Sequence, residues 1–447
     1  MGLSKADKNK LLSTGTAPCK FKVTIKDHKA LNDRNSLPLR PIAAVANNPT
    51  EKVDWLLSQI LGQLLHYIPS HLKSTKNLIG IFQQVDCTAL TPAYNFISLD
   101  VVSLYPCIPL AEGNQWVITF LQLHQHDINL FNLTIEQIQN ALHFITSNCL
   151  IQNNNDIYKQ AKGVPMGSHS APIFAIICMN HIESQALARL PQHLVPRVFN
   201  RFIDDIIMGP YLHNPDEAKV ILGIFNSIHP AIQFTLDNPL PAIPLNFLDL
   251  SISIDHGSIL YEWYQKPMHS GNALRADSAH PHHTKSNFIK TRIQNVHQCS
   301  NYPDSLANGM DKLAAFLRGN GYNHNTLQSA QKTKRTRQRS NHTWSNCTKL
   351  RTPFFSDTTN RKIQKCVKQS GLPIKTVPLT GPQLGRRLCS NQPKIGCTNA
   401  NCSLCPSILP RFTCKDKLIV YQYTCRLCQM TYIGETSRPL FIRHQEH

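Results

Sequence analysis

Two adjacent carboxylates lie inside an apolar strand pattern, and they constrain the fold more than any other feature. Asp204 and Asp205 are enclosed by the apolar stretch 198–208, and Asp100 lies in a second such stretch at 96–102. A strand cannot bury these charges unless something positive compensates them. A pair of divalent cations shared by the three carboxylates is the simplest solution, because Mg²⁺ prefers oxygen ligands of this kind.

The charge balance indicates the class of partner. The 447 residues include 46 Lys and Arg against 27 Asp and Glu, a formal net charge of +19. This excess predicts a polyanionic partner, of which nucleic acid is the commonest. A basic protein without chemistry would share the charge but would not explain acids inside apolar strands. No apolar run has the length of a membrane-spanning helix, so we expect no membrane association.

Two further segments fit phosphoryl transfer by two metal ions. Tyr105 follows Asp100 by five residues, where its ring can lie beneath an incoming sugar and exclude a 2′-hydroxyl. Residues 162–168 separate the two acidic strands, and glycines there allow the backbone to approach a nucleotide closely. We expect this segment to bind substrate through Gly163, Pro165, Met166 and Gly167.

These segments, in this order, resemble the reverse transcriptases. The matching motifs are SLDVVSLYPCIP at 98–109, KGVPMGSHSAP at 162–172 and RFIDDI at 201–206. Four shorter segments resemble the Penelope-like retroelements more narrowly, and these lie at 24–29, 38–42, 246–250 and 264–267. The resemblance implies an RNA-directed DNA polymerase that uses two Mg²⁺ or Mn²⁺ ions, an RNA template, a DNA primer and dNTPs.

The resemblance also implies roles for individual residues. Asp100, Asp204 and Asp205 would bind the catalytic metal ions, and Tyr105 would be the sugar gate. Two positions depart from common patterns: Phe202 replaces a tyrosine and keeps the ring, and Met166 stands where retroviral enzymes carry glutamine.

Three basic residues fall in the segment that resembles the fingers. Lys26, Lys29 and Arg40 are candidates for contact with the triphosphate, and Arg40 suits bidentate phosphate binding. The alternative is a solvated basic loop that touches only the template backbone.

The expected fold is α+β, a right-hand polymerase whose palm contains an antiparallel sheet, followed by a basic linker and a small Cys-rich module. The predicted segments are partial fingers at 1–95, palm at 96–265, a helical thumb or helix-turn-helix-like segment at 266–330, a basic polar linker at 331–388, and the Cys-rich module with the start of a nuclease domain at 389–447.

The C-terminal cysteines have zinc-ligand spacing. Cys397, Cys402, Cys405 and Cys414 match a four-thiolate site, and Cys425 with Cys428 follow closely. Because six thiols exceed one tetrahedral site, the choice of ligands stays open. Free cysteines in a reduced compartment are the alternative.

The last segment resembles the opening of a GIY-YIG endonuclease. The matching residues are Tyr421, Tyr423, Tyr432, Gly434 and Arg443. In that family a glutamate further along binds the metal, and the chain ends at His447 before such a residue. We therefore expect no endonuclease activity from this chain.

The basic run at 332–339 is compatible with a nuclear localisation signal, a nucleic-acid tether or a solvated linker. We expect a nuclear location from this run and from the implied function, and a cytoplasmic location is the alternative. The alternative to an active polymerase is an inactive, truncated retroelement remnant that only binds nucleic acid.

Overall fold

The computed structural model describes most of the first three quarters of the chain and parts of the remainder. The described residues are 17–25, 39–45, 48–153, 156–240, 243–255, 257–267, 271–323, 348–379, 402, 404–405, 408, 413–417, 419–424, 429–436 and 438–445. The chain divides into two compact units, one formed by Met1–Ser278 with His282–Gln338 and the other by Ala279–Pro281 with Arg339–His447.

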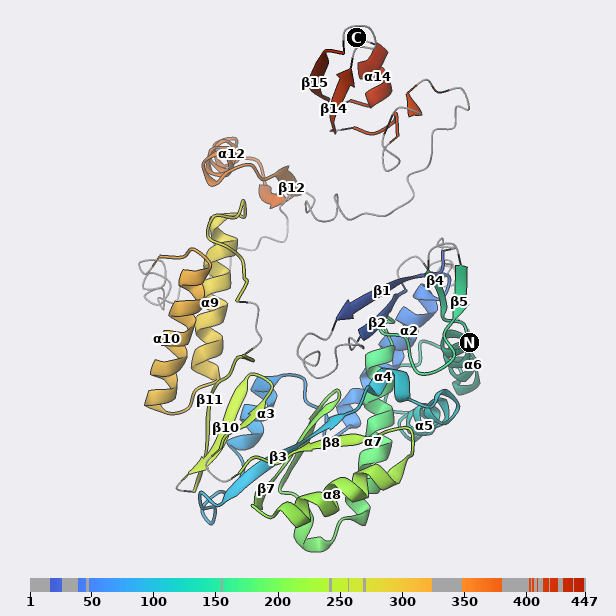
Figure 1. The fold of residues 1–447 in the computed structure, drawn as a ribbon, viewed down its shortest axis with the longest axis vertical. Helices are drawn as coiled ribbons and strands as arrows, with labels where there is room; N and C mark the ends of the chain where they lie inside the picture. Colours follow the sequence, from blue (N-terminus) through green and yellow to red (C-terminus); the bar gives the residue numbers. More distant parts are fainter. Residues whose placement is uncertain are drawn as a thin grey trace. The chain divides into compact units, whose positions relative to one another are not determined.

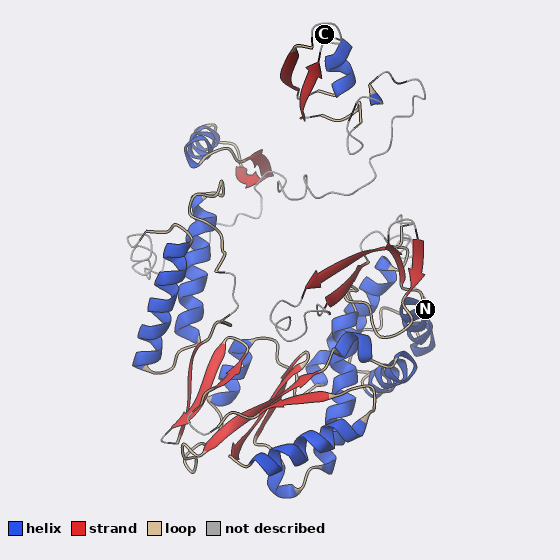
Figure 2. Cartoon of the chain, in the orientation of Figure 1, coloured by secondary structure: helices blue, strands red, loops and turns tan. Residues whose placement is uncertain are grey.

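The centre of the first unit is a four-stranded antiparallel sheet, visible in Figure 1. Its spatial order is β6 (Val198–Phe202), β7 (Asp205–Leu212), β3 (Tyr94–Val101) and β8 (Phe234–Asp237). This is the antiparallel palm sheet that the sequence predicts, and the α+β class is confirmed. Figure 2 shows helices lining the sheets of this unit.

Alternation along β3 divides its side chains between two environments. Ile97, Leu99 and Val101 enter a core shared with α7 (Ala171–Arg189) and α8 (Pro215–Ile228), whereas Phe96 enters a second core. Successive side chains of a strand point to opposite faces. Asp100 therefore lies on the face away from α7 and α8, and the helices never bury its charge.

A second sheet begins in the segment predicted as fingers and combines strands that are distant in sequence. Its order is β2 (Leu39–Ala44), β1 (Cys19–Ile25), β4 (Leu150–Asn153) and β5 (Asp156–Lys159), and only the β1–β4 pair is parallel. β4 and β5 fall inside the segment predicted as palm. The predicted segments, which are continuous in sequence, do not include this pairing. The chain leaves the central sheet after β3, contributes β4 and β5 to the second sheet, and returns to the central sheet at β6.

Helices connect the strands of these two sheets along the chain. They are α2 (Glu51–Gly62), η2 (Gln63–Tyr67), α4 (Leu104–Cys107), α5 (Leu110–Leu123), α6 (Ile135–Ser147) and η3 (Gln192–Leu194), together with α7 and α8. The side chain of Thr134 caps α6 by accepting a hydrogen bond from the backbone N–H of Gln137. In return, the side chain of Gln137 accepts a hydrogen bond from the backbone N–H of Thr134. The central helix α7 has ten buried residues, which explains why its sequence is apolar on nearly all sides.

The remainder of the first unit packs around the second core. It contains α3 (Thr75–Phe82), a three-stranded sheet of β11 (Ser258–Trp263), β10 (Leu250–Asp255) and β9 (Leu245–Phe247), and the helices α9 (His282–Gln298) and α10 (Pro303–Gly319). The two helices contact each other and β11, in the segment predicted as a helical thumb.

Part of the expected linker is folded. Within 331–388, β12 (Thr348–Pro353), α12 (Asp357–Gln369) and β13 (Ile374–Leu379) form a β–α–β unit, and the two strands are parallel. The helix α12 was hard to recognise in the sequence because its composition is polar. Only two of its residues, Ile363 and Val367, are both apolar and half-buried. Further on, β14 (Ile419–Thr424) and β15 (Thr431–Thr436) form an antiparallel hairpin next to α14 (Leu440–Gln445).

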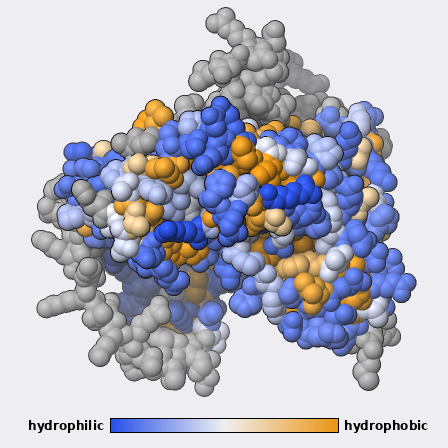
Figure 3. All heavy atoms as spheres, turned by 90° about the horizontal axis from the view of Figure 1, so that it is seen from below, coloured by the Kyte–Doolittle hydropathy of each residue, from blue (hydrophilic) through white to orange (hydrophobic). Residues whose placement is uncertain are grey.

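Among the described residues, no helix is long and apolar enough to cross a membrane. Hydrophilic side chains cover much of the face seen from below in Figure 3, and apolar side chains form separate patches there.

Candidate active site

Asp100 and Asp205 lie directly opposite each other in the ladder between β3 and β7. Both are half-buried, on the sheet face away from α7 and α8. Like charges directly opposite in an antiparallel pair are destabilising. The sequence nevertheless places two carboxylates there. A divalent cation bound between them would offset their repulsion, because carboxylate oxygens are its preferred ligands.

A two-residue turn of Ile203 and Asp204 connects β6 to β7. Ile203 has a φ of 58°, a value that β-branched residues rarely adopt, so the surrounding structure must hold the turn. The backbone carbonyl of Asp204 accepts a hydrogen bond of 3.3 Å from the N–H of Val101. The turn is therefore tied to the strand that carries Asp100.

Tyr105 lies on the short helix α4, directly after β3. Its side chain is half-buried. Burial raises the pKa of its phenol, and the negative charge of Asp204 raises it further. The phenol therefore stays protonated at neutral pH. Its pKa also shows that Tyr105 lies close enough to the Asp204 carboxylate to be affected by its charge.

The segment around Gly163 packs against the backbone of Tyr105. Gly163 has a φ of +70°, and a β-carbon there would collide with the carbonyl oxygen of Tyr105 and with Pro106. The N–H of Val164 donates a 2.9 Å hydrogen bond to that same carbonyl. Glycine is thus required by both the backbone conformation and the close approach.

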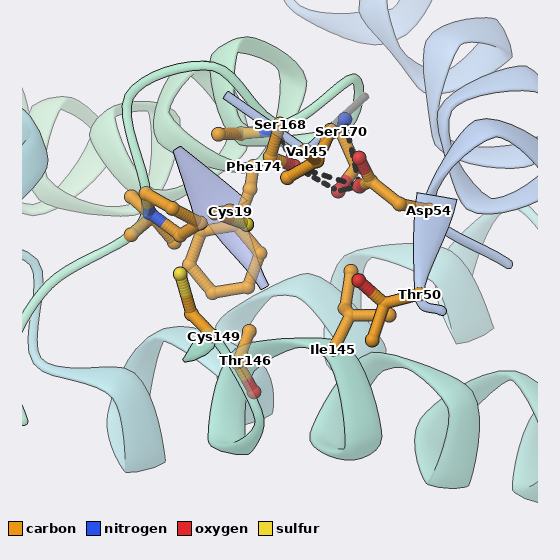
Figure 4. A pocket seen from close by; sticks show the side chains of 13 residues that line it. Cys19, Val45, Thr50, Asp54, Ile145, Thr146, Cys149, Ser168, Ser170 and Phe174 are labelled. Carbon is orange, nitrogen blue, oxygen red and sulfur yellow. Dashed lines mark hydrogen bonds between the residues drawn. The ribbon is translucent and has the colours of Figure 1, made fainter. Parts of the chain in front are cut away.

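Asp54, which is 1% exposed on α2, organises the next part of this segment. Its carboxylate accepts hydrogen bonds from Ser168 Oγ at 2.7 Å, His169 N–H at 2.6 Å, Ser170 N–H at 3.1 Å, and Ser170 Oγ. Figure 4 shows Asp54 directed at both serines, at one side of a pocket that Cys19, Cys149 and Phe174 also line. The carboxylate also lies where α7 begins, so it stabilises the positive end of that helix.

The strand β2 is connected to the same segment. The N–H of Ala43 donates a 2.8 Å hydrogen bond to the carbonyl of Met166. Arg40 is three residues earlier in β2 and is exposed. The candidate phosphate-binding cation is therefore on a strand that contacts the predicted substrate-binding loop.

Arg201 is fully buried below the Ile203–Asp204 turn. Its Nε forms a salt bridge with Glu183 of α7, and its terminal nitrogens donate to the carbonyls of Ile203 at 2.9 Å and Ile176 at 3.0 Å. Ser70 Oγ donates to Glu183 at 2.7 Å and completes the network. The buried charge is thus paired and hydrogen-bonded, and one of its bonds supports the strained turn.

Comparison with protein families identifies one stretch of this unit. Residues 38–227 match the family model described as reverse transcriptase (RNA-dependent DNA polymerase), and this range includes the three carboxylates and the loop at 162–168. This stretch is a reverse transcriptase domain. No curated protein matches the chain.

Solved structures of polymerases resemble the chain at low identity. A telomerase from Candida albicans, in complex with a fragment of telomeric RNA, matches at 12% identity and a TM-score of 0.47, over 74% of this chain and 58% of that one. Apo telomerase from Candida tropicalis matches at 13% identity and a TM-score of 0.44, over 74% of this chain and 63% of that one. The Sicinivirus 3Dpol RNA-dependent RNA polymerase matches at 11% identity and a TM-score of 0.42, over 72% of this chain and 69% of that one. The chain spans less than two thirds of the telomerase chains it resembles.

The reverse transcriptase domain thus assembles most of the predicted site. Asp100, Asp204 and Asp205 meet at one end of the palm sheet. Tyr105 follows that end of β3 and is affected by the charge of Asp204, and the segment at Gly163 contacts the backbone of Tyr105. Lys26 and Lys29 lie outside the described residues.

Sequence reasoning missed three residues that hold this site, namely Asp54, Glu183 and Arg201. Asp54 follows Glu51 and Lys52, Glu183 precedes Ser184 and Gln185, and Arg201 follows Asn200. No isolated charge in an apolar run therefore marked these residues, and only the fold shows that they are buried.

In the second unit, three of the four predicted zinc ligands lie together. The sulfur atoms of Cys402, Cys405 and Cys414 are all within 4.8 Å of one another. Cys397, Cys425 and Cys428 lie outside the described residues.

The predicted tyrosine cluster is also assembled. Arg443 Nε donates a 3.0 Å hydrogen bond to the hydroxyl of Tyr421, and a β-carbon at Gly434 would collide with the Tyr421 ring. Tyr423 and Tyr432 face each other across the β14–β15 ladder. His444, which sequence reasoning did not single out, forms a 3.0 Å hydrogen bond with the Tyr423 hydroxyl.

Proposed function

We propose that the reverse transcriptase domain is an RNA-directed DNA polymerase of the Penelope-like retroelement type, and that it works by two-metal nucleotidyl transfer. The observation that carries this proposal is the Asp100–Asp205 pair, in register on the sheet face away from the helices and joined by Asp204 at the adjacent turn. The narrower Penelope-like assignment rests on the motifs in the sequence.

The residues present fit a pair of divalent cations. Two carboxylates on adjacent strands and a third on the adjoining turn supply hard oxygen donors, and their mutual repulsion would be relieved by bound cations. Asp100, Asp204 and Asp205 would hold the ions. When bound, the ions would lower the pKa of the primer 3′-hydroxyl and neutralise the charge on the transferred phosphate.

The chain's own residues position the substrates. The Tyr105 ring would lie against the sugar of the incoming nucleotide and exclude a 2′-hydroxyl. The Gly163–Gly167 loop would support the nucleotide with its backbone, because Asp54 and the backbone of Tyr105 fix that loop on both sides. Arg40 would bind the triphosphate by paired hydrogen bonds.

Primer extension on an RNA template tests this proposal. Purified full-length protein should incorporate dNTPs in Mg²⁺ or Mn²⁺, and substitution of Asp204 by Asn should abolish incorporation. Folded protein that binds the primer–template without incorporating a nucleotide would instead support the inactive remnant.

We infer a structural zinc ion for the Cys402–Cys414 segment. Thiolates about 2.3 Å from a tetrahedral zinc lie about 3.8 Å apart, which the observed clustering accommodates. Three sulfur atoms within 4.8 Å of one another support this inference. The ion would stabilise this segment, as structural zinc does in small modules.

We infer that the β14–β15 hairpin with α14 is of GIY-YIG type. The Arg443–Tyr421 hydrogen bond and the packing of Gly434 against the same ring support this inference. The absence of endonuclease activity stays a prediction. A nicking assay with supercoiled plasmid and Mg²⁺ tests it, and nicking that disappears in Arg443→Ala would show that the prediction is wrong.

A further inference from the structure

The β–α–β unit at 348–379 carries an unusual concentration of positive charge. It contains seven Lys or Arg residues and a single acid, Asp357. No residue of α12 is buried, so the unit presents nearly all of these side chains to its surroundings. The net formal charge of these 32 residues is +6.

Three of the cations share one face of the two-stranded sheet. The strands pair in parallel register, and Lys349 lies beside Lys375. Arg351 is two residues further along β12, so alternation places it on the same face. All three residues are exposed. Three exposed cations on one face can contact successive phosphates of an anionic ligand together, so the arrangement favours such a ligand.

The helix adds a second cationic row. Arg361, Lys365 and Lys368 are spaced i, i+4 and i+7, so they follow one stripe of α12. Ile363 and Val367 lie on the opposite side and are half-buried, whereas the three cations are exposed. Within the described part of the chain, no salt bridge neutralises this stripe.

An aromatic ring adjoins the cationic strand. Phe355 is two residues past the end of β12, and 73% of its surface is exposed. An exposed aromatic side chain near clustered cations is the combination that binds single-stranded nucleic acid, because phosphates contact the cations and an unpaired base stacks on the ring.

We propose that residues 348–379 form a binding module for single-stranded nucleic acid. Lys349, Arg351 and Lys375 contact phosphates, Phe355 stacks on a base, and the α12 stripe extends the electrostatic surface. A duplex offers no unpaired base for the ring, which is why the module prefers single strands. The proposal does not depend on polymerase activity.

The test uses full-length protein and fluorescently labelled oligo-dT and oligo-U, with binding measured by anisotropy over a series of salt concentrations. The test variants are Lys349→Gln/Lys375→Gln and Phe355→Ala. The matched control is Arg189→Gln/Lys219→Gln, which removes two exposed cations from α7 and α8. Crosslinking with iodouracil-containing oligonucleotides, followed by peptide mapping, locates the contact within the chain.

Loss of two phosphate contacts should lower the slope of log K against log salt by about 1.4, since each contact on a single strand contributes about 0.7. Phe355→Ala should weaken binding by about 5- to 150-fold without changing that slope. The control should match the wild type, and crosslinks should map to Phe355. Comparison of oligo-dT with oligo-U shows whether DNA or RNA is preferred.

Two results would overturn the proposal. One is an unchanged slope in the Lys349→Gln/Lys375→Gln variant together with no crosslink inside 348–379. The other is displacement of the oligonucleotide by poly-glutamate at equal charge concentration, which would mean that the surface recognises acidic polypeptides. Thermal melting of each variant verifies that it is folded.

Discussion

The guanidinium of Arg201 donates a 2.9 Å hydrogen bond to the carbonyl of Ile203, within the turn that presents Asp204. The same guanidinium is paired with Glu183 on the central helix α7. Loss of either partner alone from a buried pair costs about 3–5 kcal/mol, because the remaining charge is uncompensated. The network therefore connects the stability of the core to the position of a proposed metal ligand.

This connection predicts that Arg201→Lys lowers the rate of nucleotide incorporation more than it lowers primer–template affinity. Lysine preserves the charge opposite Glu183 but lacks the planar group that reaches Glu183, Ile203 and Ile176 together. We expect a rate loss of about 10- to 100-fold, the size of effect that a 1 Å misplacement produces, and a higher Mg²⁺ concentration at half-maximal rate. Single-turnover extension measures both quantities.

Glu183→Gln is the matched control, because it removes the charge and keeps the Arg201–Ile203 hydrogen bond. If the network only stabilised the fold, the two variants would lose activity in proportion to their loss of thermal stability. A slower Arg201→Lys enzyme at equal stability supports the positioning role.

Tyr105 is predicted to discriminate against ribonucleotides. Truncation in Tyr105→Ala removes the ring, so the ratio of dNTP to rNTP incorporation should fall by at least about 10-fold. Tyr105→Phe keeps the ring and should keep the discrimination. Steady-state incorporation of matched dNTP and rNTP pairs measures the ratio, and an unchanged ratio in Tyr105→Ala would exclude the sugar-gate role.

Gly163→Ala should impair the loop that supports the nucleotide. The added methyl group meets the carbonyl oxygen of Tyr105, and the φ of +70° disfavours alanine. We expect a higher KM for dNTP and a lower melting temperature. Gly223→Ala is the control: it lies in α8 with nothing within 4 Å of the new methyl group, and alanine there should stabilise the helix by about 0.5–1 kcal/mol.

Zinc content is predicted to depend on Cys402. Purified wild-type protein should contain about one zinc ion per chain, a tetrahedral thiolate site holding a single ion. Cys402→Ser should lose it. Cys366→Ser, an exposed cysteine on α12, should retain full zinc content. Mass-spectrometric metal analysis after dialysis decides, and zinc-free folded wild-type protein would contradict the site.

The sequence alone predicted that three carboxylates lie together, but it did not predict all of the framework that carries them. Asp100, Asp204 and Asp205 were recognisable because a charge in an apolar strand requires a partner. The pairing of β4 with β1 was not predictable, since it joins residues about 130 positions apart through very few paired residues, and strand propensity does not specify which strands pair. The α12 helix was missed because its apolar stripe is reduced to a few residues among many cations.

The supports of the site were missed for a different reason. Asp54 reads as an ordinary acidic residue in the first turn of a helix, where it would stabilise the helix from an exposed position. Only the folded chain reveals that α2 turns this carboxylate inward to the backbone of His169 and Ser170. Burial of a helix face depends on its neighbours, which the local pattern does not specify.

The central claim is that Asp100 and Asp205 together hold the catalytic metal ions. The most direct measurement is the single-turnover rate of incorporation on an RNA template in Mg²⁺, for the wild type, Asp100→Asn and Asp205→Asn. Asp216→Asn, an exposed carboxylate on α8, is the control. We predict a loss of at least about 10³-fold for each site variant, equivalent to several kcal/mol of transition-state stabilisation, and no change for the control. Wild-type rates in folded Asp100→Asn or Asp205→Asn protein would contradict the account.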